Sequence, residues 1–360
     1  MSDTEELLRG VLRQRAEEAP GMHDLQLDTP SPRSRWRWMA PLAVAAVTAA
    51  LVLGVVSLSN WHTGTTTTAS VPDPDLSGVL YTVIYHVNQY PKERTVLFTT
   101  DRDGNSSRVS TSDMDMYSAD WSPDGTQIAF TGLRSGEINP GLYVMSADGT
   151  GITSVLEDGR LWPADVSWSA DGSSIYFASS NDHGMVVKNI DVATGINTTV
   201  TNSGDLHFAV SPRDDQLAII RATTNEGDDE ESLATFVLST ADGSVIEEMP
   251  GSGRTPAWSP DGQKLAYADE QDQWIIEDMT SGSTVMLDPP SEGMYIGEVA
   301  WGPDENYVLI ETVSPDSRMK LFVVDLSAGT YQQVVDMGEG RLIGDISWGH
   351  SPASTSPADE

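Results

Sequence analysis

The stretch "TTDRDGN", from Thr99 to Asn105, spaces its acidic side chains as oxygen ligands for a hard cation would be spaced. Asp101, Asp103 and Asn105 alternate along the chain, as the first ligands of calcium-binding loops do. A tight turn explains the same residues, because "SADGT" and "STADG" recur further along the chain without the additional aspartate. We favour the turn and keep Asp101, Asp103 and Asn105 as the cation candidates.

Two other acidic stretches are candidates of the same kind. They are Asp214-Asp215 and the run "EGDDEES" from Glu226 to Ser232. A run of like charges is most simply a solvated loop. If the protein binds cations at all, we expect them at these two stretches or at the turn near Asp101.

The motifs of common enzymes are missing from the chain. It contains no G-x-S-x-G, H-E-x-x-H or P-loop pattern. It also has no cysteine, which excludes disulfides and thiolate metal sites, and its six histidines are scattered. We therefore predict a protein that is not an enzyme, with no catalytic residues, no metal centre and no cofactor.

The net charge argues against nucleic acid as a partner. The chain has 54 acidic and 20 basic residues, for a formal charge of −34, and nearly all of the excess follows residue 58. Nucleic acid binding needs basic side chains to neutralise phosphates. An acidic surface suits solubility, hydrated cations or a basic partner.

A repeat organises most of the chain. Trp121 opens "WSPDGTQIAF", and similar segments open at Trp168, Val210, Trp258 and Trp301, at intervals of 42 to 48 residues. The S-P-D-G letters are typical of a tight turn between antiparallel strands. The apolar triplet that follows predicts a strand covered on both faces, as in a propeller blade. Trp348 opens a last unit that the chain does not complete.

A second marker gives the number of blades. Six hairpin turns fall between strands, at Asp103-Gly104, Asp148-Gly149, Thr194-Gly195, Asp242-Gly243, Ser281-Gly282 and Ala328-Gly329. The first turn has no opener before it, whereas the last opener, in "GDISW", has no turn after it. We infer that "GDISW" supplies the first strand of the first blade and closes the ring, because closure leaves no sheet edge unpaired.

These repeats resemble a known family. The "WSPDG" turn, the apolar triplet such as "IAF" and the later "DG" turn are similar to the WD40-like repeat of bacterial TolB-type propellers, from Val79 to Pro352. The resemblance implies an all-β, six-bladed β-propeller, placed here at residues 79–350. The protein that names the type has an additional globular domain before its propeller and works in the periplasm. This chain has a predicted membrane anchor there, so that protein's partners are not expected.

The segment before the repeats predicts a membrane anchor. Residues 39–58 contain no charge over 20 positions, enough for a helix to cross the bilayer. Three arginines precede them, at Arg33, Arg35 and Arg37, which places the N-terminus in the cytoplasm and the propeller outside the cell membrane. A cleaved signal peptide is the alternative. Residues 59–78, rich in Thr, Ser and Pro, are expected to be a tether, and residues 351–360 a disordered tail.

Residues 1–38 form a cytoplasmic stub with one predicted short helix. Leu7, Leu8, Val11 and Leu12 fall on one face of that helix, which could bind a partner protein or lie at the membrane. For the propeller we predict a non-enzymatic module that binds a protein or ligand in the cell envelope, as a sensor or regulator. The alternative is a hydrolase or lyase that acts on envelope glycans through carboxylates at the propeller channel.

Overall fold

The computed structural model describes residues 74–349, except for 87–92, 110–112, 158–160, 183, 202–204, 214–215, 225–230, 252–253 and 339–340. The anchor at 39–58, the stub with Leu7, Leu8, Val11 and Leu12, and the tail at 351–360 lie outside the described residues. So do Asp214, Asp215 and the middle of the acidic loop at 225–230. Within the described part, no helix is long and apolar enough to cross a membrane.

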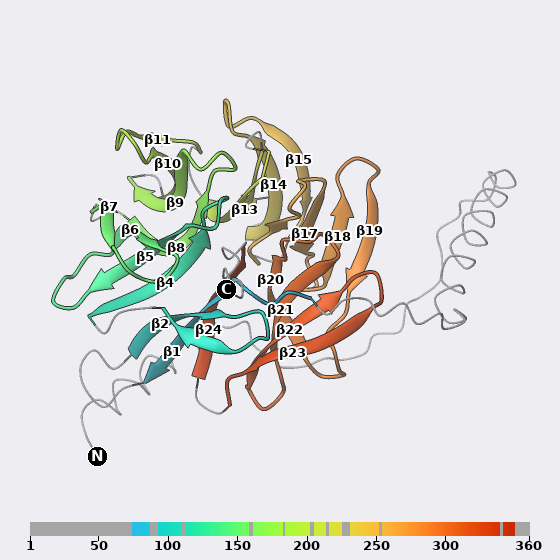
Figure 1. Ribbon diagram of the computed structural model, residues 1–360. Coiled ribbons are helices and arrows are strands. Elements are labelled where there is room, and N and C mark those ends of the chain that lie inside the picture. The colour runs from blue at the N-terminus through green and yellow to red at the C-terminus, as the bar shows by residue number, and fades with distance from the viewer. Residues whose placement is uncertain are drawn as a thin grey trace, which may run out of the picture. The chain divides into compact units, whose positions relative to one another are not determined.

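In the part of the chain that the structure describes, twenty-four strands form six antiparallel sheets of four strands each, and the sheets are arranged in a ring (Figure 1). The first three blades, each given from its innermost strand outward, are β24 (Arg341–Trp348), β1 (Val79–His86), β2 (Glu93–Thr100) and β3 (Ser106–Arg108); β4 (Met114–Trp121), β5 (Gln127–Arg134), β6 (Gly141–Ser146) and β7 (Thr153–Leu156); and β8 (Leu161–Trp168), β9 (Ser174–Asn181), β10 (Gly184–Asp191) and β11 (Asn197–Thr199).

The remaining three blades follow the same order. They are β12 (Asp205–Val210), β13 (Gln216–Thr224), β14 (Glu231–Ser239) and β15 (Val245–Pro250); β16 (Ala257–Trp258), β17 (Lys264–Ala268), β18 (Trp274–Asp278) and β19 (Ser283–Leu287); and β20 (Tyr295–Trp301), β21 (Tyr307–Val313), β22 (Met319–Asp325) and β23 (Thr330–Asp336). The prediction of an all-β, six-bladed propeller is thus confirmed.

The S-P-D-G segments form the turns between the first and second strands of their blades. In blade 2 the N–H of Gly125 donates to the carbonyl of Ser122 at 2.8 Å, and Asp124 accepts from the Ser122 hydroxyl and from the N–H of Thr126. Gly125 has a φ of 69°, a conformation that favours glycine. The triplet that follows, Ile128 to Phe130, is fully buried, as a strand covered on both faces must be.

Each opener ends the innermost strand of its blade and pairs with the first triplet residue of the next strand. Trp121 lies opposite Ile128, and Trp168 lies opposite Ile175. Val210 takes the same position opposite Leu217, so the substitution of valine for tryptophan changes the side chain and not the register. The six openers are Trp348, Trp121, Trp168, Val210, Trp258 and Trp301, in blade order.

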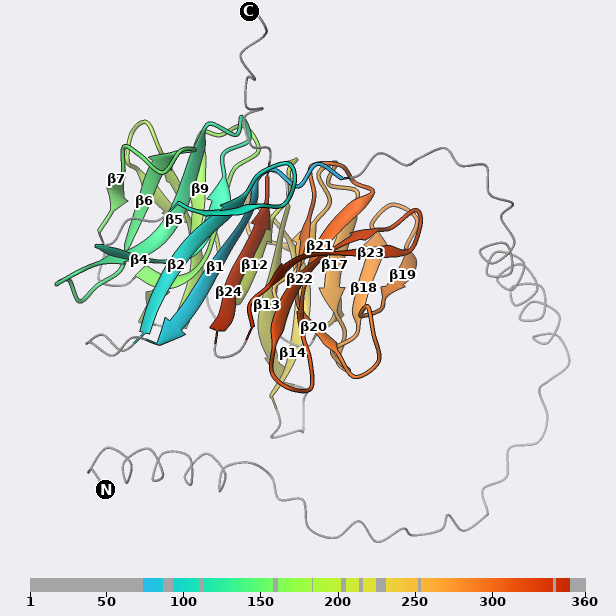
Figure 2. The same ribbon diagram turned by 60° about the horizontal axis from the view of Figure 1, so that its bottom comes forward.

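The ring closes through the last strand. β24 pairs with β1, with Trp348 opposite Val79 and Ile346 opposite Tyr81, so the first blade joins the two ends of the described chain (Figure 2). The predicted closure by "GDISW" is confirmed. Buried side chains of neighbouring blades then pack against one another, as in the cluster of Val79, Tyr81, Leu309 and Trp348.

Packing begins a few residues before β1. Leu76 is buried among the side chains of the first and last blades, its N–H donates to the carbonyl of Arg102, and its carbonyl accepts from the hydroxyl of Thr100. The N–H of Gly78 donates to the carbonyl of Thr100. The folded part therefore includes Leu76 to Gly78, the last three residues of the expected tether.

Candidate functional site

The residue three positions before each opener is polar in every blade. We call these six residues the polar ring. They lie on the innermost strands, or directly before β16 in blade 5, and these strands neighbour one another around the channel. In blade order they are Asp345, Ser118, Asp165, His207, Thr255 and Glu298.

A β-bulge precedes the polar ring in several blades. The register of β4 shifts between Met116 and Ser118, that of β12 between Asp205 and His207, and that of β20 between Ile296 and Glu298. β24 shifts at the corresponding place, opposite Tyr81 and Val83. A bulge bends its strand and redirects the next side chain, which brings these side chains into a common layer.

The polar ring provides hydrogen-bond acceptors for the innermost strands, whose inner edge has no pairing strand. Asp345 accepts the N–H of Ala119 at 3.1 Å, and Ser118 accepts the N–H of Val166 at 3.2 Å. Asp165 accepts the N–H of Phe208 at 2.9 Å. Each acceptor thus satisfies a backbone donor of the following blade, which buried donors require.

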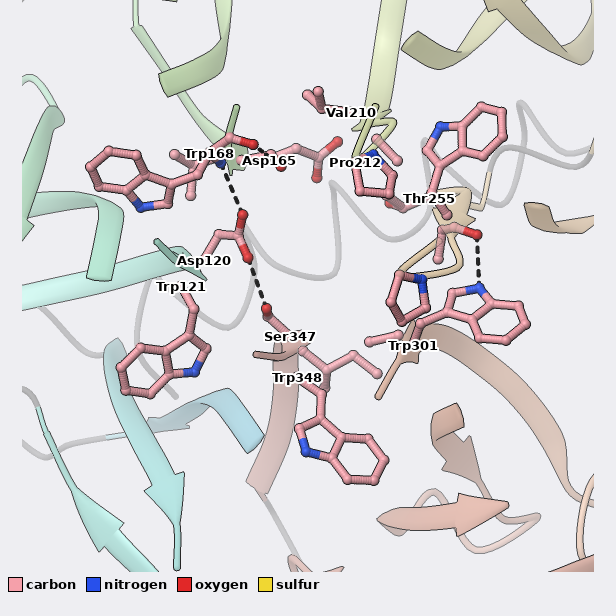
Figure 3. Close-up of a pocket in the computed structure, with 18 of the residues that line it drawn as sticks. Asp120, Trp121, Asp165, Trp168, Val210, Pro212, Thr255, Trp301, Ser347 and Trp348 are labelled. Atoms are coloured by element: carbon pink, nitrogen blue, oxygen red, sulfur yellow. Dashed lines mark hydrogen bonds between the residues drawn. The ribbon is translucent and has the colours of Figure 1, made fainter. Parts of the chain in front are cut away.

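Asp120, one residue before its opener, adds a further link between blades. Its carboxyl group accepts the N–H of Trp168 at 2.9 Å and the hydroxyl of Ser347 at 3.0 Å. Figure 3 shows this carboxyl group between Trp168 of blade 3 and Ser347 of blade 1. Burial raises the pKa of Asp120, and these hydrogen bonds oppose the rise.

This pattern of hydrogen bonds between blades ends at blade 5. The residue that corresponds there to the donors Ala119, Val166 and Phe208 is Pro256, which has no N–H to donate. His207, the ring residue before it, turns instead to Asp165 of the preceding blade, with Nδ1 at 3.0 Å from Oδ2. This hydrogen bond raises the pKa of His207, while burial opposes the rise.

Two ring carboxyl groups on neighbouring blades, Asp345 and Glu298, share a hydrogen bond. Burial, reinforced by the charge of Asp165, raises the pKa of Asp345 to about 7. Burial, followed by the charges of Asp345 and Asp165, raises the pKa of Glu298 well above its usual range. Burial and the neighbouring charges thus favour the protonated forms of these two carboxyl groups.

A third carboxyl group lies behind Glu298 on the next strand. Glu311 pairs with Glu298 across β20 and β21, and only 6% of its surface is exposed. Its carboxyl group reaches toward the innermost strand at Gly297, where a Cβ atom would collide with Oε2. Among the described residues, Oε1 has no hydrogen-bond partner. Burial raises the pKa of Glu311 to about 7, and the charge of Arg254 opposes the rise.

Five residues of the polar ring, all except His207, form the floor of a cavity of about 500 Å³ at one end of the channel. Its rim, which we call the collar, consists of the residues two positions after the openers of blades 2 to 6: Pro123, Ala170, Pro212, Pro260 and Pro303. The indole rings of the openers Trp121, Trp168, Trp301 and Trp348 point away from the centre of the cavity (Figure 3). The site is thus a rigid funnel with an apolar rim and an acidic floor.

Two openers tie this end of the channel to the point where the chain enters the propeller. The indole N–H of Trp121 donates to the carbonyl of Gly78 at 2.8 Å, and that of Trp348 donates to Ser77 at 3.2 Å. The N–H of Gly349 also donates to Gly78. The described chain therefore enters and leaves the propeller on the face where the cavity opens.

The cation candidates form a turn that lies outside this cavity. The carboxyl group of Asp101 accepts hydrogen bonds from the N–H groups of Asp103 and Asn105 and from the Asn105 amide. This is the third turn of blade 1, between β2 and β3, and Gly104 has the positive φ that such a turn needs. The predicted turn is therefore present, and cation binding by Asp101, Asp103 and Asn105 stays a prediction. In the part of the chain that the structure describes, no three His, Asp or Glu side chains are placed to hold a metal ion.

No family model matches the chain. Among solved structures, TolB from Acinetobacter baumannii aligns with a TM-score of 0.58 at 20% identity, over 76% of this chain and 68% of TolB. The chain has the fold of a TolB-like six-bladed propeller. A chain of a nidogen/laminin complex aligns over 76% of this TolB-like propeller chain and 99% of its own length, with a TM-score of 0.53 at 9% identity. At these identities the likeness shows the fold alone.

One curated relative of the TolB-like chain is an uncharacterised protein of Agrobacterium fabrum. The two are 27% identical over 183 residues, which cover 48% of this chain and 61% of the relative. The match thus spans less than two thirds of the relative's length.

Proposed function

We propose that the protein is a non-enzymatic binding module that receives a protein partner of the cell envelope at the cavity. The observation that carries this proposal is the funnel itself, in which the innermost strands of six blades and the turns of five of them surround an acidic floor. Loops held by a rigid scaffold are the usual place of binding. One solved chain of this fold comes from a complex between two proteins, nidogen and laminin.

The hydrogen bonds of the floor favour binding over catalysis. Asp120, Asp165 and Asp345 each accept a backbone N–H of the next blade, so their carboxyl groups hold the ring together. A rigid floor of this kind costs little conformational entropy when a partner binds. The same hydrogen bonds leave these three carboxyl groups less able to transfer protons.

The second candidate is a glycan hydrolase or lyase. The pair of Asp345 and Glu298 supports it, because a carboxyl group with a raised pKa beside a second one is what glycoside hydrolysis uses. Release of reducing sugar from envelope glycans by the wild-type protein, and its loss in Glu298→Gln, would favour this candidate.

The proposal includes the membrane topology expected from the sequence. Residues 39–58 anchor the protein in the bilayer, residues 1–38 are cytoplasmic, and the propeller lies outside as part of a sensor or regulator. Leu7, Leu8, Val11 and Leu12 are then the contacts of a cytoplasmic partner. Protease added to intact cells should degrade the propeller and spare the stub, whereas a protected propeller would contradict this orientation.

The binding proposal is tested by blocking the collar. Ala170→Trp places a bulky side chain at the rim of the cavity, and Ala193→Trp makes the same change at an exposed turn of the same blade. In pull-downs from envelope membranes with the full chain, we expect the partner to be lost with Ala170→Trp and kept with Ala193→Trp. Equal recovery with both variants would contradict binding at the cavity.

A further inference from the structure

The floor of the cavity carries several carboxyl groups, and His207, whose pKa is raised, pairs with one of them, Asp165. Among the described residues that line the cavity, Asp120, Asp165, Glu298 and Asp345 are acidic, and none is lysine or arginine. Burial, and then the charges of Asp345, Asp165 and Glu311, raise the pKa of Glu298. A cation at the floor would relieve this repulsion.

Glu311, which lies behind Glu298 and outside the residues that line the cavity, gives a second indication that this side of the floor binds a ligand. A buried carboxyl oxygen without a hydrogen-bond partner is costly, and native proteins rarely leave one. Oε1 of Glu311 has no hydrogen-bond partner among the described residues, although only 6% of the residue is exposed, and the charge of Arg254 acts on the carboxyl group without a hydrogen bond to Oε1. Its carboxyl group points inward over Gly297, toward the strand that holds Glu298.

The arrangement suits an organic cation better than a metal ion. A metal ion needs several oxygen ligands at 2.0 to 2.6 Å, and no three acidic or histidine side chains of the described residues are placed to provide them. A guanidinium group presents five N–H donors in a plane and pairs with separated carboxylates. It is also less strongly hydrated than an ammonium group, so it enters a partly buried site at a lower cost.

Pro256, where the hydrogen bonds between ring residues and backbone N–H groups end, indicates which side of the floor such a group would occupy. In blades 1 to 3, the ring residue accepts a hydrogen bond from a backbone N–H of the next blade. The ring continues with Thr255, directly before Pro256, and with Glu298, and Glu311 lies directly behind Glu298. This side offers one hydroxyl group and two carboxyl groups.

We propose that the floor of the cavity binds one guanidinium group, from an arginine side chain of the partner that enters through the collar. Glu298 is its direct carboxylate partner, and Glu311 supplies a second negative charge behind it. This inference rests on the proposed function, because it names the chemistry by which the partner is held.

The test uses a pair of probes that differ only in charge. Nα-acetyl-arginine amide and Nα-acetyl-citrulline amide have nearly the same shape, but the urea group of citrulline is neutral. Each is titrated into the purified full chain in non-ionic detergent at pH 8, with binding measured by calorimetry. We expect the arginine probe to bind at least tenfold more tightly than the citrulline probe.

Matched variants locate the binding. Glu298→Gln and Glu311→Gln should each weaken binding of the arginine probe at least fivefold. Glu292→Gln removes the same charge at an exposed position away from the cavity and should change it less than twofold. Circular dichroism checks that each variant is folded, and the comparison of the two probes on the wild-type protein needs no variant at all.

The inference is overturned if the two probes bind alike, or if Glu298→Gln and Glu292→Gln behave alike. Tighter binding of Nα-acetyl-lysine amide than of the arginine probe would also overturn it. Its failure is distinct from failure of the proposed function. If Ala170→Trp abolishes partner capture while both probes bind alike, only the guanidinium inference fails. If no partner is captured while the arginine probe binds selectively, the proposed protein partner is wrong instead.

Discussion

The backbone N–H of Ala119 donates a hydrogen bond of 3.1 Å to the carboxyl group of Asp345, 226 residues later in the sequence. Asp345 belongs to the strand that closes the ring, and Ala119 lies in the blade that follows. One side chain therefore serves both closure and the floor of the cavity. This relationship ties the stability of the ring to the properties of the site.

The first prediction concerns closure. A truncation after Gly338 removes β24 and with it the buried Ile343, Ile346 and Trp348. Large buried apolar side chains contribute about 1.5 to 3 kcal/mol each, so we expect the free energy of unfolding in urea to fall by roughly 5 kcal/mol or more. Removal of residues 353–360 alone leaves β24 whole and should not change it. Equal midpoints for the two truncations would contradict the closure.

The second prediction concerns the core of a blade. Phe130 is fully buried, and its ring stacks on Tyr143 with the centroids 5.5 Å apart. Phe130→Ala should lower the free energy of unfolding by about 3 to 5 kcal/mol, because it leaves a cavity between packed sheets. Val285→Ala alters a side chain that is 59% exposed and should cost less than about 0.5 kcal/mol. Urea denaturation of both variants measures the difference.

The third prediction is a dependence of stability on pH. The pKa of Glu311 rises from 4.5 to about 7 on folding, so the folded protein keeps a proton that the unfolded chain releases between these values. The free energy of unfolding therefore falls as pH rises from about 4.5 to 7.

Glu311→Gln should remove this part of the dependence. At pH 8 the variant should be more stable than the wild type by about 2 to 3 kcal/mol, and at pH 4 the two should agree. Melting of both proteins across this range tests the prediction, with Glu292→Gln as the control. A variant less stable than the wild type at pH 8 would show that ionised Glu311 has a partner.

The fourth prediction concerns the link between blades 3 and 4. The hydrogen bond to Asp165 raises the pKa of His207. Asp165→Asn keeps an oxygen that accepts the N–H of Phe208 but removes the charge, so the pKa of His207 should fall. NMR titration of the histidine ring, assigned with His207→Gln, measures this pKa. An unchanged pKa would mean that Asp165 does not set it.

The blades could be predicted from the sequence because the residues that define them repeat. Trp121 and its equivalents, the S-P-D-G turns and the glycines of the third turns have side chains or conformations that the fold needs in every blade. Even Val210 could be placed, since the spacing to its triplet was kept. Closure by "GDISW" was predictable because the first and last units were each incomplete.

The polar ring could not be recognised in the same way. Its residues are of five types, and their common feature is a position three residues before the opener, next to a bulge that the sequence does not mark. Their contacts join separate blades, as when Asp345 meets Ala119. One signal was available: Glu311 interrupts the apolar strand "YVLIETV", where a buried acid is unusual.

Attachment of a photo-crosslinker at the collar tests the binding role of the cavity most directly. A p-benzoyl-phenylalanine residue at position 170 lines the cavity, whereas the same residue at position 193 lies on the exposed third turn of the same blade. In intact cells, illumination should join position 170 to one defined protein and leave position 193 without that product. A product of the same size and yield from both positions, or from position 193 alone, would contradict the cavity as the binding surface.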